Sequence, residues 1–273
     1  YVLHEIVHNT HVLDALRGRG AIFVEELEEI PAGAVTIFSA HGVSRAIAEQ
    51  ATSLGLRTID ATCPLVSKVH RRMIGLHRKG YDVIVIGHKG HPEVEGTCGQ
   101  AEGPVHLVSK PSEIASLQAT NPDRIGYVTQ TTLSVDDTAE MVEAIRRRFP
   151  AVAAPERTDI CYATTNRQLA VRRLADRVDL VLIVGSKNSS NSNRLREVAE
   201  LRQTPAHLID DAGEMDPAWF VGVERVGISA GASAPEHLVV QVVDWLRRHG
   251  ARSVEEMEGE EEHISFLVPD FTV

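Results

Sequence analysis

Two cysteines in similar surroundings could act as metal ligands. Cys63 and Cys161 each stand between an expected strand end and a helical pattern. Twenty-four positions lead from Cys63 to Gly87, and the same 24 lead from Cys161 to Gly185. Taken singly, each thiol is better explained as a small buried apolar group. The equal spacing instead indicates a repeated unit that carries a thiol at one fixed place.

Polar loops follow the strands of this repeat. Gly87-His88-Lys89-Gly90-His91 corresponds to Gly185-Ser186-Lys187-Asn188-Ser189, and Thr129-Gln130-Thr131-Thr132 corresponds to Ala230-Gly231-Ala232-Ser233. A third copy opens the chain, with His4-Glu5-Ile6-Val7-His8 and Ser39-Ala40-His41-Gly42 in the same places. The sequence therefore predicts three similar units in succession.

Continued backward, this register places a third cysteine about 24 residues before Leu3, outside the given sequence. Tyr1 stands inside an expected strand, so we expect the chain to be N-terminally incomplete. Three units around a pseudo-threefold axis would bring three thiolates together. Three thiolates with one open position suit an iron–sulfur cluster that binds substrate, whereas four cysteines are usual in electron transfer. With two of three thiolates, we expect weak or absent cluster loading in protein that starts at Tyr1.

The loops also collect donors that suit a polyanion. His8, His41, His88 and His91 all follow apolar runs, and the serines and asparagine at 189–191 and Ser233 add neutral donors. Imidazolium, hydroxyl and amide groups can all donate hydrogen bonds to phosphate oxygens. A single histidine in such a place is usually a hydrogen-bonded structural residue. Zinc is an alternative for the cluster, but His88 and His91 lack a partner pair at zinc-finger spacing.

Glu93 stands two residues after His91 and is a candidate proton donor. Pro92 favours an extended or turn geometry at this point. A surface carboxylate is the ordinary alternative, and the neighbouring Glu95 could take the same role. Cys98 has no counterpart in the other units and is expected to be a structural thiol.

Short apolar runs that alternate with helical patterns predict an α/β fold with largely parallel strands. Ligands of such sheets collect at the carboxyl ends of the strands. The expected strands are Val35–Phe38, Val83–Ile86, Ile125–Val128, Leu180–Val184 and Val226–Ile228, with weaker signals at Tyr1–Val7 and Thr58–Asp60. The expected helices are Ser44–Leu54, Leu65–Lys79, Val135–Phe149, Thr165–Arg177, Asn193–Leu201 and Pro235–Arg248. The repeat divides the chain into units at 1–62, 63–158 and 159–250, followed by a tail at 251–273.

Composition narrows the class of protein. The chain has 273 residues, of which 43% are hydrophobic, and no apolar stretch approaches the ~20 residues that cross a bilayer, so we expect a soluble globular protein without a membrane span. The net charge of −10 argues against a nucleic-acid partner. Six glutamates at 255–262 predict a solvated loop. Three cysteines are too few for a disulfide framework and indicate a reducing cytoplasm.

Seven strings in order resemble the 4-hydroxy-3-methylbut-2-enyl diphosphate reductases, the last enzymes of the non-mevalonate isoprenoid pathway. They are Glu5-Ile6-Val7-His8-Asn9, Phe38-Ser39-Ala40-His41-Gly42-Val43-Ser44, Asp60-Ala61-Thr62-Cys63-Pro64-Leu65-Val66, Gly90-His91-Pro92-Glu93-Val94-Glu95-Gly96-Thr97, Thr129-Gln130-Thr131-Thr132-Leu133-Ser134, Cys161-Tyr162-Ala163-Thr164-Thr165-Asn166-Arg167-Gln168 and Gly185-Ser186-Lys187-Asn188-Ser189-Ser190-Asn191-Ser192. The resemblance implies a trefoil of three similar α/β domains around a central [4Fe–4S] cluster with an open iron site. Family members begin with a segment that carries the first cluster cysteine.

The resemblance also implies residue roles. Cys63 and Cys161 would be two cluster ligands, and Glu93 would relay protons to the substrate hydroxyl. The residues that would contact the allylic diphosphate substrate are His8, His41, His91, Thr131, Thr164, Thr165, Ser189, Ser190, Asn191 and Ser233. The implied reaction removes the allylic hydroxyl reductively and gives isopentenyl and dimethylallyl diphosphate. A ferredoxin or flavodoxin would supply the electrons.

Two other functions stay open on the sequence. A noncatalytic phosphate- or metal-binding protein would use the same loops with merely packed thiols, and would contain no iron. A zinc-dependent hydrolase would contain one zinc per chain and would act without a reductant. Metal analysis distinguishes the three.

Overall fold

The computed structural model describes residues 1–260 and 262–266. The chain divides into two compact units, which are described separately. The first contains Tyr1–Val7 and Arg19–Cys161, and the second contains His8–Gly18 and Tyr162–Ile264.

The first unit carries two sheets and the helices beside them. The elements of its first part are β1 (Val2–Leu3), β2 (Phe23–Val24), the 3-10 helix η1 (Leu27–Glu29), β3 (Val35–Phe38), α2 (Arg45–Ser53) and β4 (Arg57–Asp60). The elements of its second part are α3 (Pro64–Arg78), β5 (Asp82–Ile86), α4 (Pro92–Cys98), β6 (Val105–Val108), α5 (Pro111–Ser116), β7 (Ile125–Thr129) and α6 (Val135–Arg148).

The second unit carries one sheet. Its elements are α1 (Thr10–Gly18), α7 (Tyr162–Ala175), β8 (Leu180–Val184), α8 (Ser190–Leu201), β9 (Ala206–Ile209), the 3-10 helices η2 (Ala212–Glu214) and η3 (Pro217–Phe220), β10 (Val226–Ala230) and α9 (Glu236–Arg248).

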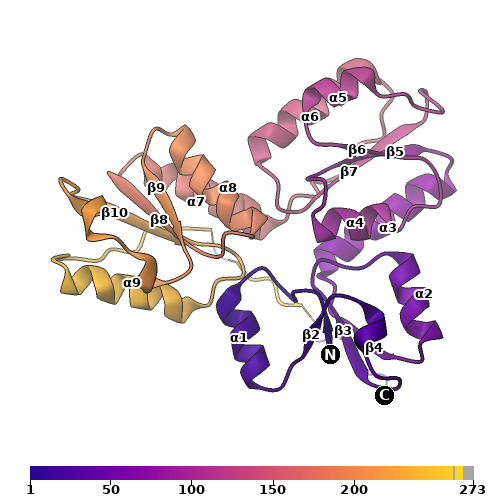
Figure 1. Cartoon of the computed structure of the whole chain (residues 1–273). Helices are drawn as coiled ribbons and strands as arrows, with labels where there is room; N and C mark the ends of the chain where they lie inside the picture. Colours follow the sequence, from indigo (N-terminus) through magenta and orange to yellow (C-terminus); the bar gives the residue numbers. More distant parts are fainter. Residues whose placement is uncertain (261, 267–273) are drawn as a thin grey trace. The chain divides into compact units, whose positions relative to one another are not determined.

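The paired strands of these sheets are parallel in the described structure, as the sequence predicts. The strand orders are β2-β1-β3-β4, β6-β5-β7 and β10-β8-β9 (Figure 1). In each sheet, the first strand of the repeat (β1, β5 or β8) pairs with a later strand on either side. The carboxyl ends of these strands therefore lie at one edge of each sheet, where parallel sheets form their binding sites.

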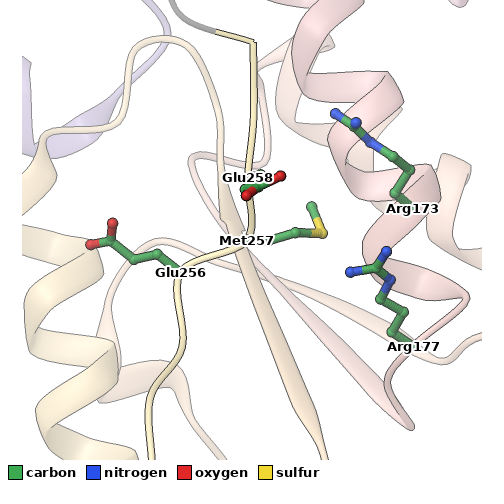
Figure 2. Close-up of a pocket in the computed structure, with 5 residues that line it drawn as sticks. All are labelled: Arg173, Arg177, Glu256, Met257 and Glu258. Carbon is green, nitrogen blue, oxygen red and sulfur yellow. The ribbon is translucent and has the colours of Figure 1, made fainter.

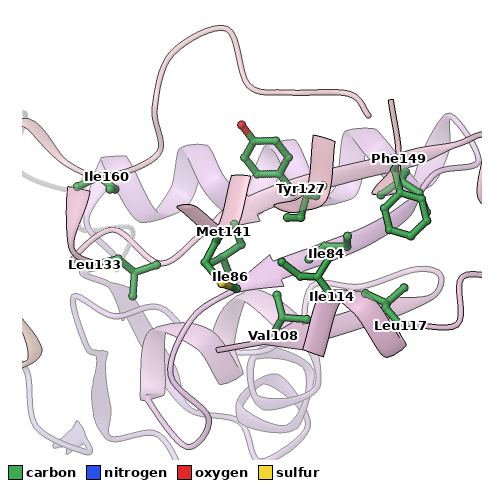
Figure 3. Close-up of a cluster of buried hydrophobic side chains, with 12 residues drawn as sticks. Ile84, Ile86, Val108, Ile114, Leu117, Tyr127, Leu133, Met141, Phe149 and Ile160 are labelled. Atoms are coloured by element: carbon green, nitrogen blue, oxygen red, sulfur yellow. The ribbon is translucent and has the colours of Figure 1, made fainter. Parts of the chain in front are cut away.

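Helices cover both faces of the second sheet. In Figure 1, α5 and α6 lie on one face of β5–β7, and α3 and α4 lie on the other. Ile84 and Ile86 point into the cluster with α5 and α6 that Figure 3 shows, whereas Val83 and Val85 pack against α3 and α4. Because both faces are covered, every residue of β5 is buried. The third sheet follows the same rule, and every residue of β8 is buried.

Small features that recur at equivalent positions support the internal repeat. After β2, β6 and β9, a glutamate accepts the backbone N–H of the residue four positions earlier; the pairs are Glu29 with Glu25 (3.0 Å), Glu113 with Ser109 (2.7 Å) and Glu214 with Asp210 (3.0 Å). Gly126 of β7 lies under Leu76, and Gly227 of β10 lies under Leu174. A Cβ at either glycine would come within 2.7 Å of the leucine, so both helices need a bare strand to pack against.

The predicted strands at β3, β5, β7, β8 and β10 are confirmed, but the sequence analysis does not predict β2, β6 or β9. β6 and β9 each contain a histidine within a four-residue run, so they do not stand out as apolar segments. The weaker strand signal at Tyr1–Val7 is reduced to Val2–Leu3. α7 and α8 each begin three residues earlier than predicted.

Each predicted unit range contains one of the sheets, while the boundaries at residues 62, 158 and 250 stay a prediction. The described part of the predicted acidic loop is outside helices and strands, and its glutamates are exposed; Glu261 lies outside the described residues. No helix among the residues described has the length and apolar character needed to cross a membrane.

Candidate active site

A buried carboxyl group is held at the start of α4. His91 precedes the helix and Pro92 occupies its first position, where the missing N–H of proline is not needed. Glu93 follows and is 2% exposed. The predicted extended or turn geometry is found at His91, the residue before Pro92, whose backbone is extended, and the helix begins at Pro92 because the φ angle of proline also suits a first helical turn.

Thr131 holds the Glu93 carboxyl with two hydrogen bonds. The Thr131 backbone N–H donates to Oε1 (2.6 Å), and its hydroxyl donates to Oε2 (2.9 Å). Burial raises the pKa of Glu93 to about 7, and the two hydrogen bonds from Thr131 oppose that rise. A carboxyl group with this pKa can both give and take a proton near neutral pH. Glu95 is exposed, so the structure separates the two candidates that the sequence left open.

His41 and His91 come together although 50 residues separate them. Their rings meet edge to face with centroids 5.7 Å apart. The His91 Nδ1 atom accepts the backbone N–H of Glu93 (3.2 Å), so the neutral ring carries its proton on Nε2. His91 can therefore donate a hydrogen bond from Nε2, while its Nδ1 caps the first turn of α4 at Glu93.

Close backbone packing fixes the two histidine loops against each other. A Cβ on Gly96 of α4 would lie 2.9 Å from the Gly42 carbonyl oxygen, so only glycine allows this approach. Arg45 donates its backbone N–H to the Gly99 carbonyl (3.2 Å), and Gln100 Nε2 donates to the Val43 carbonyl (2.7 Å). The placement of His41 beside His91 is therefore a property of the backbone.

The two candidate ligand cysteines occupy matching positions. Cys63 immediately precedes α3, and its N–H donates to the Ala40 carbonyl (3.0 Å). Cys161 immediately precedes α7, and its N–H donates to the Thr131 carbonyl (3.0 Å). Ala40 and Thr131 each stand two residues after a strand, so the predicted repeat register of the cysteines is visible in the hydrogen bonds. Neither cysteine takes part in a disulfide within the described structure, and both are partly exposed.

These cysteines fit an iron–sulfur cluster in kind and in placement. Thiolates are the ordinary ligands of such clusters, and the N-terminus of a helix favours an anionic group. No group of three or more metal-ligating side chains occurs among the residues that the structure describes. Of the three thiolates that the sequence predicts for a cluster, the described residues would supply Cys63 and Cys161. Cys98 lies at the end of α4 and packs into an apolar cluster, where burial raises its pKa, as expected for a structural thiol.

The second unit carries the predicted serines and asparagine at the start of α8. Ser189 precedes the helix, and its hydroxyl accepts the N–H of Ser192 (3.2 Å). Asn191 is 5% exposed, and within the described structure neither its amide nitrogen nor its amide oxygen has a hydrogen-bond partner. A buried amide without partners costs stability unless a ligand or water satisfies it.

The first residues of α1 lie in this second unit as well. Ser233 donates its hydroxyl to the His8 carbonyl (3.0 Å), and the N–H of Thr10 donates to the Ser186 hydroxyl (3.1 Å). The predicted residues His8 and Ser233 are therefore brought together. Thr164 and Thr165 lie in the first turn of α7, where Thr164 is fully buried and Thr165 is partly exposed.

Three polar residues of these loops were missed by the sequence analysis. Asn9 is 1% exposed; its Oδ1 accepts the N–H of Val12 (3.0 Å), and its Nδ2 has no partner in the described structure. Ser192 is fully buried, and its Oγ also lacks one there. Gln130 accepts the N–H of His88 (3.0 Å) and so ties the two loops of the second sheet. An asparagine directly before a helix was the available signal for Asn9.

A charged hollow elsewhere in the second unit contains none of the predicted site residues. Figure 2 shows it between Arg173 of α7, Arg177 just after the end of that helix, and the chain at Glu256, Met257 and Glu258. Further along the same helix, the carboxylate of Glu262 accepts a hydrogen bond from Asn166 Nδ2 (3.2 Å) and lies 3.6 Å from Arg167. The acidic segment thus follows the basic side of α7.

A buried carboxyl group with a raised pKa, placed among polar loops at the carboxyl ends of parallel strands, is typical of the active site of an α/β enzyme. The family follows from comparison with known proteins. The family model described as LytB protein matches residues 1–247, and the chain belongs to this family.

Relatives with established names match over nearly the whole chain. A "4-hydroxy-3-methylbut-2-enyl diphosphate reductase" of Azoarcus sp. (strain BH72) is 55% identical over 269 residues, which cover 98% of this chain and 86% of that protein. A protein of the same name from Pseudomonas savastanoi pv. phaseolicola is 56% identical, with 98% and 87% covered. The predicted family and its class, the oxidoreductases, are confirmed.

Solved structures agree. The E-1-hydroxy-2-methyl-but-2-enyl-4-diphosphate reductase from Plasmodium falciparum is 40% identical with a TM-score of 0.88, and the match covers 90% of this chain and 77% of that one. A second structure, titled (E)-4-hydroxy-3-methyl-but-2-enyl diphosphate reductase, is 37% identical with a TM-score of 0.64. It covers 91% of this chain and 88% of its own. The predicted fold of similar α/β domains is confirmed.

Proposed function

We propose that this chain converts (E)-4-hydroxy-3-methylbut-2-enyl diphosphate to isopentenyl and dimethylallyl diphosphate by reductive removal of the allylic hydroxyl. The observation that carries the proposal is the Glu93 carboxyl, which Thr131 holds near His91 and His41 at a pKa of about 7. The names of the relatives supply the substrate class. The net reaction consumes two electrons and two protons and releases water.

An iron–sulfur cluster would supply the electrons, which no amino-acid side chain can deliver, and would polarise the substrate oxygen at an open iron. Among the described residues, Cys63 and Cys161 are the proposed ligands of the cluster. The proposed third ligand is the cysteine that the repeat register predicts before Tyr1. The matching N–H bonds of both cysteines support this assignment.

Glu93 is the proposed proton donor to the departing hydroxyl. Near pH 7 a useful fraction of the carboxyl is protonated because burial disfavours its charge. The Thr131 N–H and hydroxyl point at the two carboxyl oxygens, so they stabilise the carboxylate that remains after the proton has left. Burial also keeps bulk water from protonating the reacting carbon atoms indiscriminately.

The diphosphate is the proposed ligand of the histidines and of the small polar residues. His8, His41 and His91 can donate charged or neutral N–H groups, and Ser189, Ser190, Asn191 and Ser233 add hydroxyl and amide donors. The partnerless Asn191 amide supports this, because a phosphate oxygen would satisfy it. Thr131, Thr164 and Thr165 are proposed to line the substrate. These contacts would orient the hydroxyl end for protonation.

The proposed electron donor is a ferredoxin or flavodoxin, and the proposed location is the cytoplasm, where free thiols persist.

Metal content and activity test the function directly. The protein, with whatever its gene encodes before Tyr1, is purified without oxygen, and iron, sulfide and zinc are measured beside turnover with dithionite and a viologen dye. We expect iron and sulfide near four each per chain and product formation only with the reductant. One zinc per chain with reductant-independent activity would instead identify a hydrolase. Neither metal and no turnover would identify a binding protein.

A protein that starts at Tyr1 provides the matched comparison. We expect its iron content to be at most about a third of that in the longer protein, since it offers two of three thiolates. Equal loading would remove the predicted upstream cysteine from the ligand set.

A further inference from the structure

Asp159 is a buried acid two residues before Cys161 for which the proposed reaction has no use. Its side chain is 0% exposed, and neither carboxylate oxygen makes a regular hydrogen bond with the described residues. Such a carboxylate is costly to bury and needs a compensating positive charge. The nearest such charge is Lys68 of α3, whose Nζ lies 3.6 Å from Asp159 Oδ1, and Arg72 of the same helix also attracts the carboxylate.

The partner lysine stands on the helix that Cys63 begins. Lys68 lies five residues after Cys63, and its Nζ also donates to the Thr158 carbonyl (3.4 Å). Arg72, one turn further along the same side of α3, donates to the carbonyls of Ala153 (2.9 Å) and Tyr127 (3.4 Å). Two cations of α3 thus hold the chain segment that leads into Cys161.

Stability alone does not explain this arrangement. The Lys68 side chain is 44% exposed, so water screens its attraction to Asp159, while the buried carboxylate still loses its hydration. An apolar or neutral pair of similar size would be about as stable as the ion pair. What the ion pair adds is a preferred geometry between the start of α3 and the segment before Cys161.

We propose that Lys68 and Asp159 are positioning residues that fix the Cys161 segment against α3, so that the thiols of Cys63 and Cys161 are held at the spacing that cluster ligation needs. This inference rests on the proposed function, because it assigns both thiols to one cluster. Neither residue touches the substrate or supplies a ligand. Their effect on the reaction passes through the two cysteines.

The test uses the double variant Lys68→Met with Asp159→Asn, which leaves no unpaired buried charge and is expected to unfold at nearly the same temperature as the parent protein. Lys68→Arg keeps the positive charge, and Arg71→Met removes an exposed cation of α3 that lies three residues after Lys68. All variants carry Cys98→Ser, so that Cys63 and Cys161 are the thiols of the described chain. In protein freed of metal, the rate of linkage of these two thiols by a short bifunctional thiol reagent is measured.

We expect the double variant to cross-link at least fivefold more slowly than the parent, and Lys68→Arg and Arg71→Met to stay within twofold of it. Iron per chain after anaerobic reconstitution, and the EPR spectrum of the reduced protein, should change in the same variant alone. Equal cross-linking rates in all four proteins would overturn the proposal, as would a parent in which the two thiols do not link. A parent that links its thiols but binds no iron would refute the cluster while leaving the positioning role intact.

Discussion

The second and third sheets place different chemistry at the same position. β5 and β8 each end five residues before the residue that precedes a helix, which is His91 in one and Ser189 in the other. Two residues further on stand Glu93 and Asn191. Both are buried in the first turn of their helix, and both follow a glycine at the strand end.

The two side chains differ in how they are satisfied. Glu93 receives the N–H and the hydroxyl of Thr131, two residues after β7. The residue two positions after β10 is Ala232, which has no hydroxyl, and the Asn191 amide has no partner within the described structure. Equivalent backbone positions therefore hold a carboxyl group with two hydrogen bonds in one copy and an unsatisfied amide in the other. The difference agrees with the roles proposed above, in which Glu93 donates a proton and Asn191 binds the diphosphate.

The largest effect should come from removing the titratable group from the second sheet. Glu93→Gln keeps the shape of the side chain but cannot release a proton. We expect turnover to fall by about 10²- to 10⁴-fold, the usual contribution of a general acid, with little change in affinity for the diphosphate. Glu95→Gln, which changes an exposed neighbour, is the control and should leave turnover nearly unchanged. Near-normal turnover of the Glu93 variant would remove it from the proton path and break the contrast with Asn191.

The same variant tests how burial affects stability. The pKa of Glu93 is raised from 4.5 to about 7 in the folded protein, so between these pH values the folded state binds more protons than the unfolded state. Its contribution to the free energy of unfolding is therefore full below pH 4.5 and falls by about 3 kcal/mol as the pH rises past 7, at ~1.4 kcal/mol per pKa unit. Glu93→Gln should lose this slope.

A second group, the partly buried His70, changes the unfolding free energy with pH in the opposite direction, so the parent must be compared with Glu93→Gln at each pH. Burial lowers the pKa of His70 to about 4, so its contribution falls as the pH is lowered from 6.5 toward 4. The measurement is therefore the difference in denaturant unfolding free energy between parent and Glu93→Gln at several pH values. A constant difference across pH 4.5–7.5 would contradict the raised pKa.

The repeat could be predicted from the sequence because its recurring positions accept few residue types. Apolar runs mark β5, β7, β8 and β10, and the equal spacing of Cys63 to Gly87 and Cys161 to Gly185 corresponds to equivalent hydrogen bonds in the structure. β6 and β9 could not be found in this way, because partly exposed edge strands do not need an apolar run.

The residue types of the site could be predicted from the sequence, but the burial and the hydrogen-bond partners of their side chains could not. Nothing in the string around Glu93 and Glu95 says which carboxyl is buried, because that depends on Thr131, 38 residues further on. The orphaned amide of Asn191 likewise depends on what the loop after β10 lacks. Burial and pairing come from contacts distant in sequence, so they become visible only in the folded chain.

Asn191 offers the reverse experiment in the third sheet. Asn191→Leu loses no hydrogen bond seen in the structure and replaces an unsatisfied amide by an apolar group of similar size, so we expect the unfolding free energy to stay the same or rise. Affinity for inorganic diphosphate, measured by calorimetry, should fall about tenfold, the value of a hydrogen bond to a charged group.

Asn193 provides a matched control two residues away. Its Nδ2 donates to the carbonyls of Lys187 (2.7 Å) and Ser189 (2.9 Å), so Asn193→Leu should lower the unfolding free energy by about 1–2 kcal/mol. If Asn191→Leu were the less stable variant and kept its diphosphate affinity, the asparagine would be structural and the contrast between the sheets would disappear.

The smallest effect should come from weakening the Thr131 contact without removing Glu93. Thr131→Val deletes the hydroxyl donor to Oε2 and keeps the backbone N–H on Oε1. The carboxylate then loses one stabilising hydrogen bond, so the pKa of Glu93 should rise above about 7. Because the protonated form is the donor, the fall of kcat/KM at alkaline pH should move upward by up to about one pH unit, while the maximal rate changes less than about tenfold. Thr131→Ser restores the hydroxyl and should return the parent profile. An unchanged pH profile in Thr131→Val would mean that the backbone N–H of Thr131 is enough to set the pKa of Glu93. Ala232, which has the same backbone N–H, could then hold a carboxyl group in the third sheet equally well.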